Sequence, residues 1–291
     1  MKIRLQEVGT IGNELTRPEG VMALDDGSLF AADAYGRCAH IHPDGRTEFF
    51  GNVGGLPNGI CITPDGNCIV ANIGNGEIQS LSPNGSHITL ITHADGKRIL
   101  TPNFPFQDFA GRLWISNSTD NPLLDAALAR PVPDGCLVVS APGEAPRIVA
   151  TGICFANGIA VDAYNRHVYV AETMQRRILR YRILQGNRLG PAEVYGPASL
   201  GKLGFPDGIA FDEAGNLWVA FPVANSIGFI NPGGNLEMYL EDPKGFVLKN
   251  PSNICFGGKD RRIAFIGSLA GTNIPCFEVP CPGERLVHQN K

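Results

Sequence analysis

An acidic or amide side chain recurs at one point of a repeated phrase in this chain of 291 residues. RPEG, LPNG, FANG and FPDG each end in such a residue followed by glycine, and an apolar run follows. With the related third and sixth phrases included, the residues at this point are Glu19, Asn58, Asn103, Asn157, Asp207 and Ser252. Carboxylate and amide oxygens are ligands for calcium and magnesium, and they also suit manganese. Turn formation is the alternative explanation, because Asn-Gly and Asp-Gly are common in turns.

The spacing of these residues predicts how the chain folds. Subtracting their positions gives intervals of 39, 45, 54, 50 and 45 residues, which is the length of a four-stranded propeller blade. Each unit reads as a turn, an apolar strand, a polar turn and a second strand, and no segment has a convincing helical period. We therefore predict an all-β, six-bladed propeller as a single domain over residues 1–291. Blades should start near residues 17, 56, 101, 155, 205 and 250. A strand at about residues 2–8 should close the ring in the last blade.

A propeller would place the repeated residues in a ring at one depth of its central channel. The carboxylates of Glu19 and Asp207 would balance the charge of a divalent cation, and the amides of Asn157 and Asn103 would add ligands without charge. Without a cation the two carboxylates would repel each other, and one would tend to stay protonated. The second strands of the six units carry another set of residues at one equivalent position of the repeat. We expect most of them to line the pocket wall or to pack within the blades, namely Asp33, Asn72, Asn117, Glu172, Phe221 and Ser268.

The composition favours a small-molecule substrate over a macromolecular partner. The net charge of −4 offers no basic excess for nucleic acid or an anionic membrane. The start of the sequence lacks the apolar core of a signal peptide, and no apolar run approaches membrane-spanning length, so we expect a cytoplasmic location. The oligomeric state stays open.

Cysteine and histidine give little sign of a zinc centre. The eight cysteines form no CxxC pair, and those in apolar strand-like runs are expected to be buried thiols, namely Cys61, Cys68, Cys154 and Cys255. His40 and His42 alternate on one strand face, and two histidines without a third ligand are more often surface residues.

The phrases RPEG, FANGIAVD and FPDGIAFDEAGNLWVA resemble the family of senescence marker protein (regucalcin), gluconolactonase and luciferin-regenerating enzyme, and the resemblance covers essentially the whole chain. In the third unit, Gly111-Arg112 follows Asn103 at the family's spacing. The resemblance implies a six-bladed propeller with one divalent metal at the channel mouth, and hydrolysis of lactones or related esters. It implies Glu19, Asn157 and Asp207 as metal ligands, with Asn103 as a further site residue or ligand.

The chain departs from this family where sugar lactonases hold their substrate. Thr101 and Phe104 stand where the family carries arginine and aspartate, and Asp120–Asn121 is an unclear match for a further carboxylate. We expect a rather apolar pocket formed by Thr101, Phe104, Asn121, Asn58, Glu172 and Phe221. Residues 118–135, with Leu123, Leu124 and Leu128, and residues 194–204 are expected to cover the channel mouth.

These patterns together predict a metal-dependent lactonase. Calcium is the expected ion, with magnesium, manganese and zinc as alternatives. Asp207 is the expected general base, and Asn103 is the second catalytic candidate. One alternative is a non-hydrolytic family member in natural-product metabolism, such as an isomerase, a cyclase or a C–C bond enzyme. The other is a non-catalytic calcium-binding propeller, because fold does not determine function.

Overall fold

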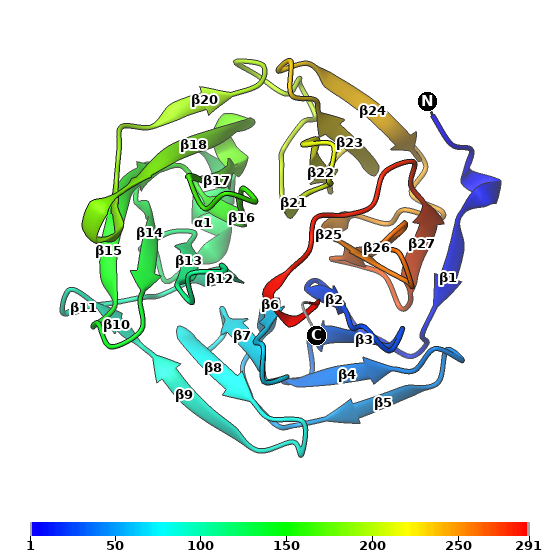
Figure 1. Ribbon diagram of the computed structural model, residues 1–291, viewed down its shortest axis with the longest axis horizontal. Coiled ribbons are helices and arrows are strands. Elements are labelled where there is room, and N and C mark those ends of the chain that lie inside the picture. Colours follow the sequence, from blue (N-terminus) through cyan, green and yellow to red (C-terminus); the bar gives the residue numbers. More distant parts are fainter. Residues whose placement is uncertain (1, 290–291) are drawn as a thin grey trace.

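The computed structural model describes residues 2–289 and has six blades around a central axis, as predicted (Figure 1). In each blade the first strand lies nearest the axis and later strands lie further out, all antiparallel. The first blade contains β2 (Val21–Ala23), β3 (Leu29–Asp33), β4 (Arg37–Ile41) and β5 (Thr47–Phe50). The second contains β6 (Pro57–Ile62), β7 (Cys68–Asn72), β8 (Glu77–Leu81) and β9 (His87–Ile91). The third contains β12 (Pro102–Gln107), β13 (Leu113–Asn117), β14 (Gly135–Ser140) and β15 (Arg147–Ile153).

The fourth blade differs from the others because its outermost strand is split. It contains β16 (Ala156–Val161), β17 (His167–Glu172) and β18 (Arg177–Leu184), and both β19 (Arg188–Leu189) and β20 (Glu193–Tyr195) pair with β18. The break between them covers residues 190–192 and includes Pro191, and proline cannot donate a ladder hydrogen bond. The fifth blade contains β21 (Ile209–Phe211), β22 (Leu217–Phe221), β23 (Ser226–Ile230) and β24 (Leu236–Glu241).

The sixth blade joins the two ends of the described chain. It contains β25 (Pro251–Gly257), β26 (Ile263–Ser268) and β27 (Ile274–Glu278), and β1 (Gly9–Ile11) pairs with β27 as its outermost strand. The predicted closure is therefore confirmed, but the expected position at residues 2–8 is wrong. That stretch contains a 3₁₀ helix, η1 (Leu5–Glu7), in which the Glu7 carboxylate accepts a hydrogen bond from the backbone of Arg4 at 2.8 Å.

Short elements decorate the blades. A hairpin of β10 (His93–Ala94) and β11 (Lys97–Arg98) links the second blade to the third. Helix α1 (Leu124–Ala129) lies in the loop after β13, so the expectation of no helix is wrong for this one six-residue segment. It is too short to show a helical period in the sequence. Further 3₁₀ turns are η2 (Thr173–Gln175), η3 (Gln185–Asn187) and η4 (Val287–Gln289). Within residues 2–289, every helix lacks the length and apolar character needed to cross a bilayer.

Repeated hairpins anchor the core between blades. Trp114 is fully buried and donates its indole N–H to Asp108 at 2.8 Å, and Trp218 donates to Asp212 at 2.9 Å in the same way. Each tryptophan thus buries its ring while satisfying its one polar atom. All eight cysteines are free, and Cys61, Cys68, Cys154 and Cys255 are buried as expected. Burial raises the pKa of the Cys61 and Cys255 thiols to about 12, so they stay protonated and unreactive.

Candidate metal centre at the channel mouth

The recurring glycine lets neighbouring inner strands touch at the start of four blades. A Cβ on Gly20 would lie 2.5 Å from the carbonyl oxygen of Asn58, and a Cβ on Gly158 would lie 2.5 Å from that of Asp207. Both glycines instead donate their N–H to these same carbonyls, at 3.1 and 3.2 Å. Gly59 and Gly208 are equally crowded by the next blade. Glycine therefore recurs in this phrase because the backbones of neighbouring inner strands come into contact there and leave no room for a side chain. The preference of Asn-Gly and Asp-Gly for turns does not by itself explain this.

A backbone irregularity accompanies the ring residue in four blades. The pairing register shifts between Pro57 and Ile60 and between Ala156 and Ile159, so Asn58 and Asn157 sit in bulges. Similar shifts occur beside Asn103 and Ser252. A bulge re-aims a side chain that would otherwise follow the strand's alternation.

All six ring residues are buried, and four of them form one hydrogen-bonded group. The amide of Asn58 donates to Glu19 Oε1 at 2.6 Å and to Asn103 Oδ1 at 3.2 Å. Ser252 donates from its hydroxyl to the backbone oxygen of Glu19 at 3.2 Å. Because Asn58 is completely buried and bonded on both sides, it supports Glu19 and Asn103 from within the protein.

The remaining two ring residues bring the second carboxylate. Burial raises the pKa of Glu19, and burial together with the nearby Glu19 charge raises the pKa of Asp207 well above its usual range. The amide nitrogen of Asn157 donates to Thr173 at 3.2 Å, and Thr173 donates to the Pro206 carbonyl at 2.7 Å. These contacts hold the Asn157 amide beside the Asp207 segment.

Arg17 adds a positive charge to this group. Its guanidinium forms an ion pair with Glu19 Oε2 and donates to Asn58 Oδ1 at 2.9 Å. Its Nη1 is buried and has no hydrogen-bond partner in the part of the chain that the structure describes. The Arg17 backbone is in the left-handed region, with φ 52°, which a non-glycine residue rarely adopts. A buried donor on a strained backbone is a feature to expect at a ligand site rather than in a plain turn.

The donor set fits a hard divalent cation. Asn157 Oδ1 is buried and accepts no hydrogen bond from residues 2–289, whereas Glu19 Oε2 is paired with the Arg17 guanidinium. Two buried carboxyls with raised pKa values gain stability when a cation replaces their protons. Oxygen atoms of Glu19, Asn157 and Asp207, with Asn103 beside them, match the ligands that calcium takes.

The second set of repeated residues holds the loops that carry the ring. Asp33 Oδ2 accepts from the backbone of Thr16 at 2.9 Å, and Asn72 Oδ1 accepts from that of Leu56 at 2.9 Å. Asn117 does the same for Leu100 and Thr101, and Glu172 for Cys154. Each acceptor lies at the end of a second strand, and each donor lies two or three residues before a ring residue. This arrangement agrees with the expectation of blade packing.

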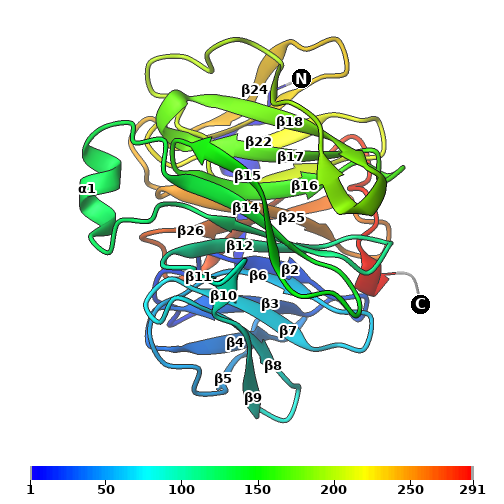
Figure 2. The same cartoon turned by 90° about the vertical axis from the view of Figure 1, so that its left-hand side faces the viewer.

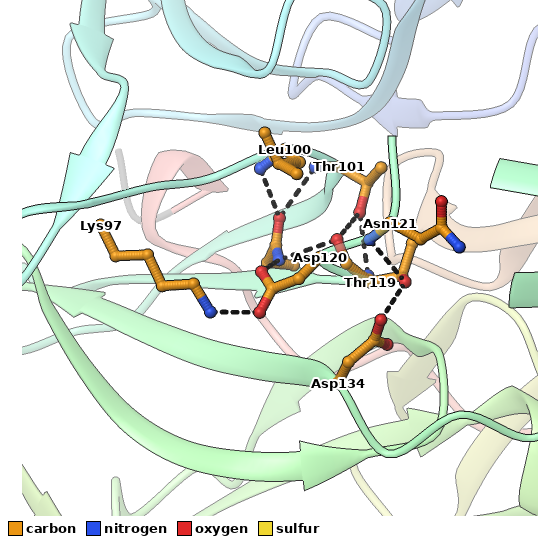
Figure 3. Close-up of polar contacts among 8 residues, drawn as sticks. Lys97, Leu100, Thr101, Thr119, Asp120, Asn121 and Asp134 are labelled. Carbon is orange, nitrogen blue, oxygen red and sulfur yellow. Dashed lines mark hydrogen bonds and ion pairs between the residues drawn. The ribbon is translucent and has the colours of Figure 1, made fainter. Parts of the chain in front are cut away.

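Two predicted pocket residues lie in a network that ties down the loop before α1 (Figure 3). The Thr101 hydroxyl donates to the Thr119 carbonyl at 2.7 Å and accepts from the Thr119 backbone at 2.9 Å. The Thr119 hydroxyl then donates to Asp134 at 2.7 Å and accepts from the backbone of Asn121 at 3.0 Å. The hydroxyl of Thr101 thus makes its hydrogen bonds within the protein. At the edge of the loop, Lys97 forms an ion pair with Asp120.

The other predicted pocket residues are dispersed. Phe104 lines an apolar cavity of about 40 Å³ toward the far end of the channel, where the chain segment Glu284–Val287 closes it. The Glu172 carboxylate accepts hydrogen bonds from Arg177 at 2.6 Å and from the Cys154 backbone at 2.8 Å, so both of its oxygens are bonded within the fourth blade, and Phe221 is buried in the core of the fifth blade. The structure therefore brings together the ring and Arg17, but not Glu172 and Phe221.

The two ends of the channel are covered differently. Helix α1 lies on one face of the propeller, and the C-terminal segment lies on the other (Figure 2). In the loop at 118–135, Leu123 is 69% exposed and Leu128 is 44% exposed, so these leucines face solvent. In the loop at 194–204, Leu200 is buried and Leu203 is exposed. Neither loop buries all of its apolar side chains over the mouth.

Sequence reasoning missed Arg17, although a signal was present. Two residues before each ring residue the chain has Arg17, Leu56, Thr101, Phe155, Phe205 and Asn250. Arg17 is the one cation among them, and it falls in the blade that supplies Glu19.

Comparison with known proteins agrees with this fold and repeat. A family model described as "SMP-30/Gluconolactonase/LRE-like region" matches residues 18–270. A strictosidine synthase-like protein 4 of Arabidopsis thaliana is 29% identical over 220 residues, 71% of this chain and 56% of the relative. A 6-deoxy-6-sulfogluconolactonase of Pseudomonas putida is 26% identical over 122 residues, 42% of this chain and 40% of that protein. The chain spans about half the length of the curated relatives it matches.

Solved structures share the architecture. A gluconolactonase of Xanthomonas campestris aligns with a TM-score of 0.76 at 19% identity, covering 95% of this chain and 89% of that one. A calcium-binding protein, regucalcin, of Agrobacterium tumefaciens aligns with a TM-score of 0.76 at 16% identity, covering 96% of both chains. At such identities the likeness shows the fold.

Proposed function

Because the chain belongs to the SMP-30/gluconolactonase/LRE-like family, we propose that it is a metal-dependent hydrolase of the lactonase type. Its substrate would be a small, rather apolar cyclic ester. The observation that carries the proposal is the buried pair Glu19 and Asp207 with the unpartnered oxygen of Asn157 at the channel mouth. The lactonase of Pseudomonas putida among its relatives supports the reaction class. The net charge of −4 supports a small-molecule substrate rather than nucleic acid or an anionic membrane.

Glu19, Asn157 and Asp207 would hold the cation, with Asn103 nearby. Calcium is the ion we propose, since the donors are oxygens and the related fold of regucalcin belongs to a calcium-binding protein. When bound, the cation would polarise the ester carbonyl and favour the ionised form of the carboxyls.

The chain's own groups have separate roles in the proposed reaction. Asp207 accepts a proton from the water that attacks the carbonyl carbon, and it returns the proton to the ring oxygen as the C–O bond breaks. The free Nη1 of Arg17 donates to the carbonyl oxygen, where negative charge develops. Asn103 orients the water or the substrate, and Asn58 keeps Glu19 and Asn103 in place through its hydrogen bonds.

The surroundings of the ring favour an apolar substrate. The Thr101 hydroxyl is hydrogen-bonded to Thr119, and the Phe104 side chain has no hydrogen-bonding group. Neither side chain therefore offers a hydrogen bond to the hydroxyl groups of a polyol. Each sugar hydroxyl left without a partner costs about 1–3 kcal/mol. Aromatic or alkyl lactones should therefore be preferred over gluconolactone.

The test is a comparison of kcat/KM for gluconolactone, dihydrocoumarin and alkyl lactones, with calcium, manganese or zinc added to metal-free protein. Metal-dependent turnover with the apolar lactones ahead supports the proposal. Faster turnover of gluconolactone would refute the substrate preference.

A non-hydrolytic reaction on a natural product is the second candidate. The strictosidine synthase-like names of several plant relatives favour it, together with the changed third blade. Metal binding at the ring without turnover of any lactone would favour this candidate, or a non-catalytic calcium-binding propeller.

A further inference from the structure

Three potential metal ligands meet on the outer strands of the first blade, away from the channel. His40 and His42 alternate along β4, and Glu48 lies on β5 directly opposite His40 in the pairing register. One ligand atom from each side chain lies within 4.8 Å of the other two. The imidazole rings of His40 and His42 pack with centroids 4.4 Å apart, so both project from the same face of the blade. The sequence showed the two histidines, and only the strand pairing supplies Glu48.

The imidazole nitrogens of this cluster are available to a ligand. Nε2 of His40 and Nε2 of His42 are shielded from solvent, and neither has a well-aligned hydrogen-bond partner within the described residues. Buried polar atoms are normally satisfied, and each one that is not costs free energy. A shared cation would satisfy both at once.

The spacing also suits a small transition-metal ion. His42 Nε2 lies 3.2 Å from Glu48 Oε2. Tetrahedral zinc with bonds of 2.0–2.1 Å separates its ligand atoms by about 3.3 Å. Two imidazoles and one carboxylate are ligands of zinc-type ions, whereas calcium and magnesium take oxygen atoms alone. Three protein ligands leave a fourth position for water.

Neighbouring side chains hold the ligands in place. Phe30 packs edge-on against His40 with ring centroids 5.0 Å apart. Arg46 forms an ion pair with Oε1 of Glu48, which leaves Oε2 on the side of His42. Contacts of this kind orient metal ligands, although the Arg46 charge also lowers the affinity for a cation.

We propose that His40, His42 and Glu48 form a second metal site, specific for a divalent ion of the zinc type and independent of the oxygen ring. Such an ion would join β4 to β5 through side chains. The proposal does not depend on the lactonase assignment.

The test uses the full chain, freed of metal by a chelator. Zinc is titrated by calorimetry in excess calcium, and cobalt(II) is used as a spectroscopic probe of geometry. We expect one zinc ion per chain under these conditions, and visible cobalt bands of the intensity typical of tetrahedral coordination. Zinc affinity should fall at least 30-fold in His42→Ala and at least 10-fold in the conservative Glu48→Gln. It should be unchanged in the matched control His93→Ala, an exposed histidine on β10.

Asp207→Asn separates the two sites. Zinc affinity unchanged by this substitution supports the proposal. Loss of zinc binding in Asp207→Asn but not in His42→Ala would place the ion at the ring and overturn it. Full zinc affinity in both His42→Ala and Glu48→Gln would also overturn it. Circular dichroism verifies that both variants are folded.

Discussion

The oxygen ring and the His40–His42–Glu48 cluster are two candidate cation sites built in opposite ways. The ring draws one residue from the start of each inner strand, so its members are far apart in sequence and equivalent in the repeat. The cluster draws on two adjacent outer strands within one blade. In both sites an arginine pairs with a carboxylate, Arg17 with Glu19 and Arg46 with Glu48.

The difference shows which kinds of site a repeat reveals. A ring at one depth of a propeller appears in the sequence as a periodic polar residue. A cluster formed by strand pairing has no such period, because its third ligand is set by the register between two strands. The ring should therefore bind an oxygen-preferring ion inside the protein, and the cluster a zinc-type ion near the surface.

The largest expected effect comes from Asp207→Asn. Removing the proposed base and one ligand charge should lower kcat/KM for the best lactone by about 10³-fold, and it should weaken calcium binding. The measurement is steady-state kinetics with calcium calorimetry, using Asp65→Asn in an exposed turn as the matched control. Calcium affinity equal to that of the unaltered protein would contradict the ring as a metal centre.

A smaller effect should follow from Gly158→Ala, which tests whether the ring depends on contact between inner strands. The new Cβ would lie 2.5 Å from the Asp207 carbonyl oxygen, so we expect a loss of about 2–3 kcal/mol in the free energy of unfolding. Gly190→Ala is the control, because its nearest neighbour would be an ordinary 3.5 Å away. Denaturant unfolding measures both. Calcium binding should weaken while zinc binding at the cluster persists, and equal stability of the two variants would speak against the close approach.

Arg17→Met should change substrate turnover and metal binding in opposite directions. Loss of the donor should lower kcat/KM by about 30-fold, and loss of a neighbouring positive charge should strengthen calcium binding several-fold. Arg46→Met should likewise strengthen zinc binding at the cluster without changing lactone turnover. Calorimetry and kinetics on both variants provide the measurement. Weaker calcium binding in Arg17→Met would mean that Arg17 supports the ligands rather than the substrate.

The smallest effect concerns Glu284, a partly buried carboxyl outside both sites. Burial, with Asp162, Asp212 and Glu213 nearby, raises the pKa of Glu284 to about 7. The folded state therefore binds this proton more tightly than the unfolded state, and the resulting stability is lost as the pH rises toward and through 7. Glu284→Gln should be more stable than the unaltered protein by about 1–2 kcal/mol at pH 8, and the difference should shrink at pH 5.

Thermal or denaturant unfolding at both pH values measures this difference. Added calcium should leave it unchanged, because Glu284 lies at the far end of the channel from the ring. A calcium-dependent difference would show that the ends of the channel are coupled.

The sequence by itself determined the propeller, the number of blades and the ring. Each blade has its own turn and strand pattern, and four of the six also carry the glycine after the ring residue, so locally repeated chemistry determines the fold. The closing strand at Gly9–Ile11 and the helix Leu124–Ala129 escaped prediction in position or type, since neither has a repeat or a period long enough to read.

Only the tertiary structure decided which polar residues meet. Thr101 binds its own loop, Asn58 is bonded beneath Glu19, and the guanidinium of Arg17 lies against the ring. Glu48 joins His40 and His42 through the register of β4 and β5. Such contacts depend on where a side chain points and on which strand lies beside it. These are properties of packing between segments, and a periodic pattern along one chain does not contain them.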